Sequence, residues 1–189
     1  MKEFILKSLK YIGFGILIVP FSIITHELGH FLAYHLFGAS NIQLHSLSVS
    51  ADKDALSNSQ IAVANIVGPL ITYLTIGLAY FAARKNYHFI WIILALAAPL
   101  GRVVNFVYIY FRLAGYDPNP NFDEFNFSKN LDIEPLFPSI FTALLVLAVF
   151  VIFFTKAWKE NGFSEISRII LSIIVGVSVW SLIGGFILP

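Results

Sequence analysis

The sequence contains no cysteine and one methionine, and charged residues make up only 12% of its 189 positions, against about 25% in a typical soluble domain. The absence of cysteine excludes a disulfide-stapled fold. A formal net charge of +1 gives no electrostatic basis for binding nucleic acid. Hydrophobic residues instead reach 58%, which excludes a disordered chain and exceeds what a soluble protein of this size can bury. We therefore expect a single transmembrane domain over residues 1–189.

Five apolar stretches are each long enough to cross a membrane as a helix, which takes about 20 residues. The first would extend to about 50 Å as one helix, so it must tilt, protrude or break. A break is expected at Pro20, because proline has no N–H to donate. The sequence predicts an all-α polytopic membrane protein with about five transmembrane helices, at residues 5–37, 60–83, 89–114, 136–158 and 168–188.

Two polar segments separate these stretches, at residues 38–59 and 115–134. In the first, apolar and polar side chains alternate roughly between Ile42 and Ser50, which predicts a short β-strand or hairpin after the first helix. The second holds prolines among Asn and Asp residues, which predicts irregular chain with one short helical turn.

Lysine and arginine residues near the ends of the predicted helices are distributed unevenly, and such residues are enriched on the cytoplasmic side of membrane proteins. We therefore expect an integral protein of the plasma membrane with a cytoplasmic N-terminus. Both polar segments and the carboxyl end of the first helix then face the extracytoplasmic side. Outside are Lys53, Arg112 and Lys129; inside are Lys2, Lys7, Lys10, Arg84, Lys85, Lys156, Lys159 and Arg168.

Residues 25–30 read T-H-E-L-G-H and lie near the outer end of the first predicted helix. His26 and His30 are one helical turn apart on the same face, so both imidazoles can bind one Zn²⁺. Glu27 lies about 100° around the helix, where its carboxylate can accept a proton from a water on the metal. This H-E-x-x-H motif predicts one zinc ion per chain, with Glu27 as the general base.

A catalytic zinc site needs a third protein ligand. Asp123 is favoured, because two prolines stiffen the chain before it and because Phe122 and Phe125 can anchor this stretch against the helices. Glu124 has a longer side chain but points to another side of the chain, and it is a competing ligand. The other outer-side carboxylates are Asp52, Asp54, Asp117, Asp132 and Glu134.

Three segments resemble the motifs of the site-2 protease family of intramembrane zinc metalloproteases, in the same order. Residues 25–38, THELGHFLAYHLFG, are similar to the zinc-helix motif, and residues 65–72, NIVGPLIT, resemble the Gly-Pro motif. Residues 118–123, PNPNFD, resemble the third motif, and the resemblance implies that Asp123 is the third zinc ligand. The zinc-site core would thus cover about residues 20–130, followed by two additional spans within 136–188.

The sequence departs from the family's pattern at three positions. Thr72 stands where the family has Asn, Asn121 replaces a Pro, and Glu124 follows the aspartate in place of Gly. The accessory soluble domains usual in the family are also missing from the sequence, so the resemblance implies that the spans themselves would control access of a substrate.

Several other residues within the predicted helices can belong to the same site. Asn65 can donate to a developing oxyanion, and Gly68 and Pro69 can either seat a substrate segment or only kink the helix. Arg102 is expected to pair with a carboxylate or carbonyl, and Asn105 to form an interhelical hydrogen bond. The histidines expected to be solvated or interfacial are His35, His45 and His88.

The sequence predicts a zinc-dependent membrane endopeptidase that hydrolyses a membrane-embedded or membrane-adjacent protein segment with a metal-activated water. An opened substrate segment could pair with the edge of the strand at residues 42–50. One alternative is a membrane zinc protease with a Glu third ligand that acts on lipidated or soluble tails. The other is a metal-binding membrane protein without catalytic activity. The expected partners are this substrate and the bilayer, with no nucleic acid.

Overall fold

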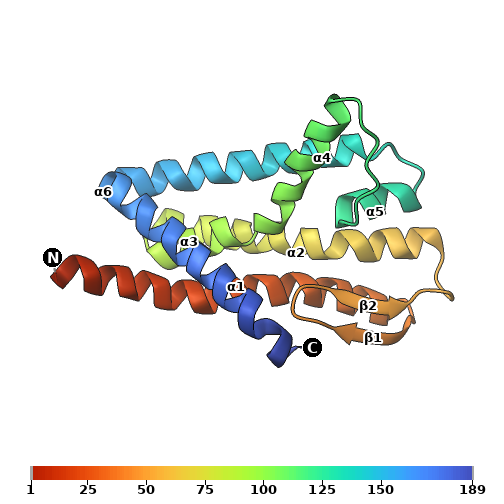
Figure 1. Ribbon diagram of the computed structural model, residues 1–189, viewed down its shortest axis with the longest axis horizontal. Coiled ribbons are helices and arrows are strands. Elements are labelled where there is room, and N and C mark those ends of the chain that lie inside the picture. The colour runs from red at the N-terminus through yellow and green to blue at the C-terminus, as the bar shows by residue number, and fades with distance from the viewer. Residues whose placement is uncertain (1, 189) are drawn as a thin grey trace.

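The computed structural model describes residues 2–188 and is mostly helical. Most helices lie along the long axis of the molecule, α4 rises away from them, and a two-stranded sheet lies near one end (Figure 1). In chain order the elements are α1 (Lys2–Leu36), β1 (Ser40–Leu44), β2 (Val49–Asp52), α2 (Asn58–Lys85), α3 (Phe89–Ala97), the 3₁₀ helix η1 (Leu100–Val103), α4 (Val104–Leu113), α5 (Asp123–Asn130) and α6 (Leu136–Ile187).

The structure has fewer membrane-spanning helices than the five predicted. A fourth is counted if Phe89–Ala97 and Leu100–Leu113 form one span bent by 42°. The bend occurs at Pro99, which has no N–H to continue the helical hydrogen bonds. Within the described residues, three helices are long and apolar enough to cross a membrane: Ile5–Leu36, Asn58–Lys85 and Leu136–Ile187.

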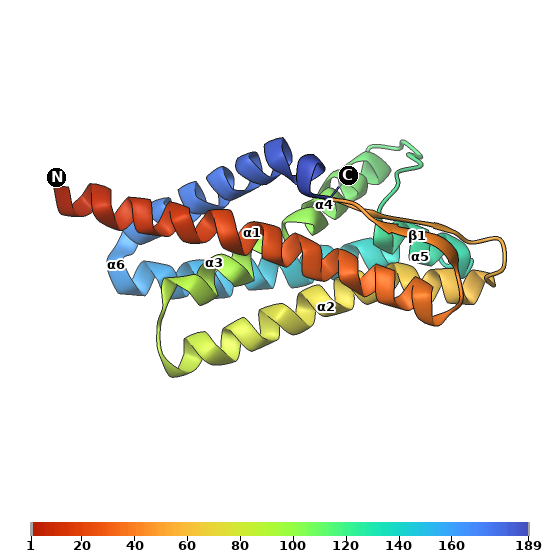
Figure 2. The same ribbon diagram turned by 90° about the horizontal axis from the view of Figure 1, so that it is seen from below.

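The fourth and fifth predicted spans form one element, α6, with a sharp bend between two arms. The backbone leaves helical geometry at Asn161 and Gly162, and φ at Gly162 is 61°, which glycine adopts without strain. The second arm runs back along the molecule toward the β-hairpin (Figures 1 and 2). The residues between the fourth and fifth predicted spans therefore form a sharp bend, and the two arms count as one helix, Leu136–Ile187.

The predicted break at Pro20 does not occur, because α1 continues from Lys2 to Leu36 with proline inside it. Close packing against the second arm of α6 supports this helix. A Cβ at Gly15 would overlap the backbone of Ser172, and a Cβ at Gly176 would overlap the backbone of Gly15. Small residues therefore allow the two helices to touch along their backbones, as is common between membrane helices.

The predicted hairpin between the first two long helices is confirmed. β1 and β2 pair antiparallel, with Gln43 opposite Ser50. The second arm of α6 holds the turn between the strands. Trp180 Nε1 donates to the Ser46 carbonyl at 3.0 Å, and the Ser46 N–H donates to the Leu188 carbonyl at 3.1 Å. The C-terminal arm thus fixes the hairpin over the bundle.

The second polar segment contains α5, which is a two-turn helix rather than the single turn predicted. Phe122 and Phe125 both pack edge-on against Tyr108 of α4, with ring centroids 5.6 Å apart in each pair. These aromatic contacts anchor the start of α5, as the sequence predicts, and α5 packs against α2. Asp123, the first residue of α5, is thereby directed toward the interior of the bundle.

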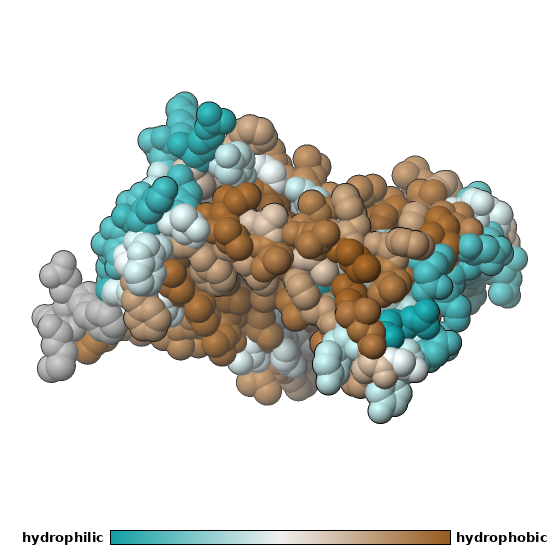
Figure 3. Space-filling view, turned by 90° about the horizontal axis from the view of Figure 1, so that it is seen from above, coloured by the Kyte–Doolittle hydropathy of each residue, from teal (hydrophilic) through white to brown (hydrophobic). Residues whose placement is uncertain are grey.

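The surface of the molecule is apolar over its middle and hydrophilic at both ends (Figure 3). The N-terminus of α1, the C-terminus of α2 and the bend of α6 gather at one end, whereas the hairpin and α5 lie toward the other (Figure 1). The two sets of basic residues in the sequence therefore belong to opposite ends. An apolar band between polar ends, together with the long apolar helices, is typical of a membrane protein.

Candidate metal centre

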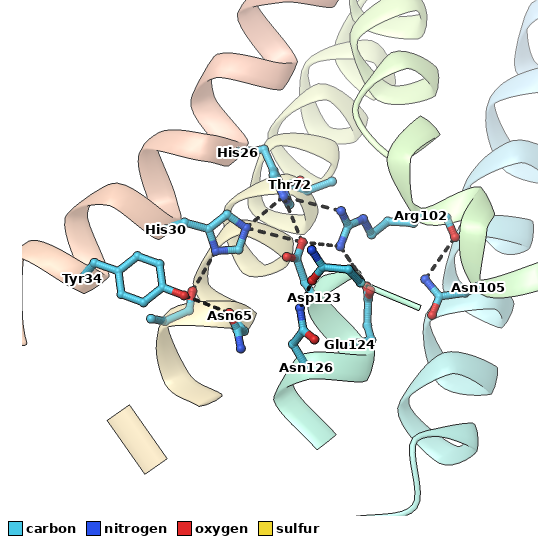
Figure 4. A network of polar contacts seen from close by, with 12 residues as sticks. His26, His30, Tyr34, Asn65, Thr72, Arg102, Asn105, Asp123, Glu124 and Asn126 are labelled. Carbon is cyan, nitrogen blue, oxygen red and sulfur yellow. Dashed lines mark hydrogen bonds and ion pairs between the residues drawn. The ribbon is translucent and has the colours of Figure 1, made fainter. Parts of the chain in front are cut away.

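α1 places His26 and His30 one turn apart on the face that packs against α2. Both side chains are buried, and their rings meet edge to face with centroids 4.8 Å apart. Their Nε2 atoms are 3.1 Å apart and converge on the interior of the bundle (Figure 4). The helix therefore presents two nitrogen ligands to one point, as the i, i+4 spacing predicts.

Contacts with α2 determine which ring nitrogen of each histidine faces this point. His30 Nδ1 lies 2.8 Å from the carbonyl oxygen of Ala64, and His26 Nδ1 lies 2.8 Å from Thr72 Oγ1. A carbonyl only accepts, so His30 carries its proton on Nδ1 and keeps the lone pair of Nε2 for a ligand. Metal-bound histidines are commonly oriented in this way. Neither partner was identified from the sequence, because contacts 34 and 46 positions apart leave no local pattern.

Asp123 completes a triangle of ligand atoms with the two histidines. Its Oδ2 lies 3.1 Å from His26 Nε2 and 3.4 Å from His30 Nε2. Ligands bound at about 2.0–2.1 Å in a tetrahedral site are about 3.3–3.4 Å apart, so the three separations fit one Zn²⁺. Burial by itself raises the pKa of the Asp123 carboxyl, but the contacts with both histidine rings and the nearby Arg102 charge outweigh it and hold the pKa below its usual range. The carboxylate is therefore ionised and can bind a cation.

Arg102, at the bend between α3 and α4, connects the triangle to a second carboxylate. Its NH1 donates to Asp123 Oδ2 at 2.7 Å and to Glu124 Oε2 at 3.1 Å. The sequence predicted a carboxylate or carbonyl partner for Arg102, and the structure provides two carboxylates. Because Glu124 is turned toward the guanidinium, its side chain does not join the group of His26, His30 and Asp123.

The other candidate carboxylates lie outside this group. Asp117 and Glu134 both pair with Arg112 at the polar end of the molecule, and Asp52 accepts a hydrogen bond from Asn41 within the hairpin. Within the described residues, the atoms of His26, His30 and Asp123 form the one histidine and carboxylate group compact enough to hold a metal ion, all within 4.8 Å of one another.

The formal charges of the side chains around the triangle also favour a divalent cation. Glu27, Asp123 and Glu124 contribute three negative charges, and Arg102 contributes one positive charge. The resulting formal charge of −2 would be costly to bury without compensation. A Zn²⁺ ion at the triangle would neutralise it.

Gly68 and Pro69 are residues of α2, and Gly68 lies against His30 of α1. A Cβ at Gly68 would overlap the imidazole of His30, so only glycine leaves room for this ring. Pro69 has no N–H, so it cannot donate to the carbonyl of Asn65, four residues earlier. The neighbouring carbonyl, of Ala64, is the one that His30 contacts. Gly68 thus has a packing role toward a histidine, and its seating of a substrate segment stays a prediction.

Two cavities meet beside the triangle, and Glu27, Leu47, Gly101 and Arg102 line both of them. The polar cavity has a volume of about 380 Å³ and is lined by residues that include Lys53, Asn65, Asn121, Asp123 and Asn126. The apolar cavity has a volume of about 270 Å³ and is lined by residues that include Val19, Ile23, Leu47, Ala97, Ala98 and Val177.

Asn65 and Glu27 are positioned to act on a molecule in the polar cavity. Tyr34 Oη donates to Asn65 Oδ1 at 3.1 Å, and both side chains line this cavity. The contact leaves the amide nitrogen of Asn65 for another acceptor. Glu27 is buried, directly follows His26 in the sequence and lines both cavities. A carboxylate and a neutral donor therefore border the same space as Asp123.

The remaining predicted residues lie outside the triangle. Asn105 donates to the carbonyl of Arg102 at 3.1 Å, so it stabilises the bend before α4 instead of forming an interhelical hydrogen bond. His35 is exposed, His45 contacts Ser50, and His88 accepts from a backbone N–H at the start of α3.

Comparisons of the chain with models of known protein families, with curated proteins and with solved structures find no match. The site is therefore described by its own geometry: two histidines from α1 and one aspartate from α5, supported by α2 and by Arg102, beside two cavities. This group of residues can hold a metal ion.

Proposed function

We propose that this protein is a zinc-dependent membrane endopeptidase, as the resemblance to the site-2 protease family implies. The observation that carries the proposal is the convergence of His26, His30 and Asp123 on one point beside Glu27. A metal group with a neighbouring carboxylate and an adjoining cavity is the minimum needed for hydrolysis by an activated water. The substrate is a membrane-embedded or membrane-adjacent protein segment.

In this proposal His26, His30 and Asp123 hold one Zn²⁺. The bound ion supplies a Lewis acid and lowers the pKa of a coordinated water toward about 7. Glu27 accepts a proton from the attacking water as its oxygen bonds to the substrate carbonyl carbon. It then donates that proton to the nitrogen as the C–N bond breaks. Asn65, oriented by Tyr34, donates from its amide nitrogen to the oxygen that becomes negative.

The hairpin offers a way to hold the substrate in an extended form. Leu47, Ser48 and Val49 line the polar cavity, and Val49 is the first residue of β2. A peptide bond inside a helix has its carbonyl engaged, so a substrate must unwind before attack. An unwound segment can pair with a strand edge beside the cavity and so present its backbone to Glu27.

The orientation in the membrane is also part of the proposal, with the N-terminus in the cytoplasm of a plasma membrane and the polar cavity on the extracytoplasmic side. It rests on the excess of basic residues at the end that holds the N-terminus of α1. Single cysteines at Asp54 and Lys129 should react with an impermeant thiol reagent on intact cells. A cysteine at Lys85 should react only after lysis, and the reverse pattern would invert the orientation.

The test of the proposed function is zinc content and peptide hydrolysis by the purified protein. Glu27→Gln should keep the metal and lower the hydrolysis rate by about 10²–10⁴-fold, because the amide cannot accept a proton. Glu160→Gln, at an exposed glutamate far from the site, is the matched control and should change neither quantity. Metal binding without Glu27-dependent hydrolysis would instead support a non-catalytic metal-binding protein.

A further inference from the structure

The two cavities beside Glu27 differ in chemical character and in position along the molecule. Of the α1 residues, those lining the polar cavity run from Glu27 to Tyr34, toward the hairpin. Those lining the apolar cavity run from Val19 to Glu27, toward the middle of the helix. The two cavities therefore adjoin each other at Glu27, with the apolar one on the side of the middle of α1.

The apolar cavity is large enough for one big side chain. Its volume is about 270 Å³, whereas an engineered apolar cavity of about 150 Å³ already binds benzene. Val19, Ile23 and Ala98 contribute to its walls. His26 also lines it, so an occupant would lie directly beside the metal triangle.

The polar cavity has the opposite character, because amides and charged groups line it. Lys53 is among them, and its Nζ lies 4.9 Å from the centre of the Tyr34 ring. Asn121 and Asn126 contribute further hydrogen-bonding groups. This cavity can solvate a polar stretch of peptide, which the apolar cavity would reject.

Gly101 leaves the junction between the cavities open. It lines both of them, and a Cβ built on it would meet nothing within 4 Å. No side chain at position 101 therefore narrows the junction beside Glu27.

We propose that the cleaved segment is a junction at which a large apolar residue adjoins a polar stretch, with the apolar side chain in the apolar cavity and the polar stretch in the polar one. The apolar cavity is then the specificity pocket for the residue next to the cleaved bond. This inference rests on the proposed function and names its substrate class. The occupant is a peptide side chain because the pocket opens toward the catalytic carboxylate.

The first test uses quenched peptides that differ only at one residue beside the cleaved bond. Leu or Phe at that position should give kcat/KM at least about tenfold above Ala. Ala98→Phe, which fills the apolar cavity, should abolish this preference while Ala peptides are still cleaved. Gly101→Leu should slow all peptides. Gly13→Leu, at an exposed glycine of α1 with open space around it, is the control and should behave as the wild type.

Zinc content and elution as a folded species confirm that each variant is intact. Equal cleavage of Leu, Phe and Ala peptides by the wild type, or an unchanged preference in Ala98→Phe, would overturn the inference while leaving the proposed function standing.

A second measurement does not depend on turnover. A peptide carrying photo-leucine at the same position, irradiated with zinc-loaded Glu27→Gln protein, should crosslink to residues of the apolar cavity such as Val19, Ile23 or Ala98. Crosslinks there without any hydrolysis by the wild type would support binding in the apolar cavity and contradict the proposed protease activity. Crosslinks confined to the polar cavity or to the outer surface would overturn the inference.

Discussion

Two clusters of charged side chains, one around Glu165 and one at the metal centre, lie toward opposite ends of the bundle. They differ in how their hydrogen-bonding atoms are paired. Around Glu165 of α6, the hydroxyls of Tyr11 and Tyr87 donate to one carboxylate oxygen, and Asn161 donates to the other. Burial, together with the hydrogen bond to Glu165, raises the pKa of the Tyr87 hydroxyl, which therefore stays a donor at alkaline pH. Every partner in this cluster complements the charge of the glutamate.

The metal centre has the reverse arrangement, because its acceptor atoms face one another. His26 Nε2, His30 Nε2 and Asp123 Oδ2 converge within 3.4 Å, and Arg102 neutralises only part of the negative charge around them. Glu165 is fully buried and lines neither cavity, whereas Asp123 lines the polar one. A satisfied cluster holds helices together, and a cluster with converging acceptors beside a cavity is suited to bind a cation.

Of the changes at the two clusters, removing a metal ligand should have the largest effect, on the amount of bound zinc. Asp123→Ala should reduce bound zinc from about one ion per chain to almost none, because two histidines alone hold the metal weakly. Glu124→Gln and Asp117→Asn should leave the metal in place. Metal analysis of the purified variants tests this, and full zinc occupancy in Asp123→Ala would transfer the ligand role to Glu124.

Removing the carboxylate of the Glu165 cluster should lower the stability of the fold without changing metal binding. Glu165→Ala removes the buried carboxylate that pairs with Arg168 and accepts from Tyr11, Tyr87 and Asn161. It should lower the free energy of unfolding by about 3–5 kcal/mol. The folded fraction should still bind zinc. Denaturant unfolding in detergent measures the change, with the exposed Glu160→Ala as control. A stable Glu165→Ala protein that had lost zinc would contradict the distinction between the clusters.

A smaller effect is expected at the hydroxyl that orients His26. Thr72→Val keeps the shape of the side chain but removes the partner of Nδ1, and should weaken zinc binding about 10–100-fold. Titration against a chelator of known affinity gives this ratio. Thr75→Val, on the same helix, is the matched control, and equal affinities of the two variants would show that Thr72 does not orient the ring.

The smallest effect should come from one of the donors to Glu165. Tyr87→Phe removes one hydrogen bond and should destabilise the fold by about 1 kcal/mol, because Tyr11 and Asn161 remain as donors to the carboxylate. The same unfolding assay measures it. A loss as large as that of Glu165→Ala would mean that the cluster depends on all of its donors together.

Much of the helical architecture could be predicted from local patterns. Long apolar stretches predict helices wherever they occur, and alternation at residues 42–50 predicts the hairpin, since both depend on neighbouring side chains. The predicted number of separate spans was too high, partly because a sharp bend at Asn161 and Gly162 joins two predicted spans into one helical element. The continuous α1 shows likewise that packing across Gly15 and Gly176 can support a helix that contains Pro20.

For the site, the sequence by itself determined that His26 and His30 share one helix face, because the i, i+4 spacing fixes their relation once a helix forms. The aromatic residues around Asp123 also indicated how its segment would be anchored. Only the tertiary structure decided that Ala64 and Thr72 orient the imidazoles, that Arg102 joins two carboxylates, and that two unlike cavities meet at Glu27. These features bring together residues distant in the chain, and such contacts arise from how helices pack and not from the spacing of residues within one helix.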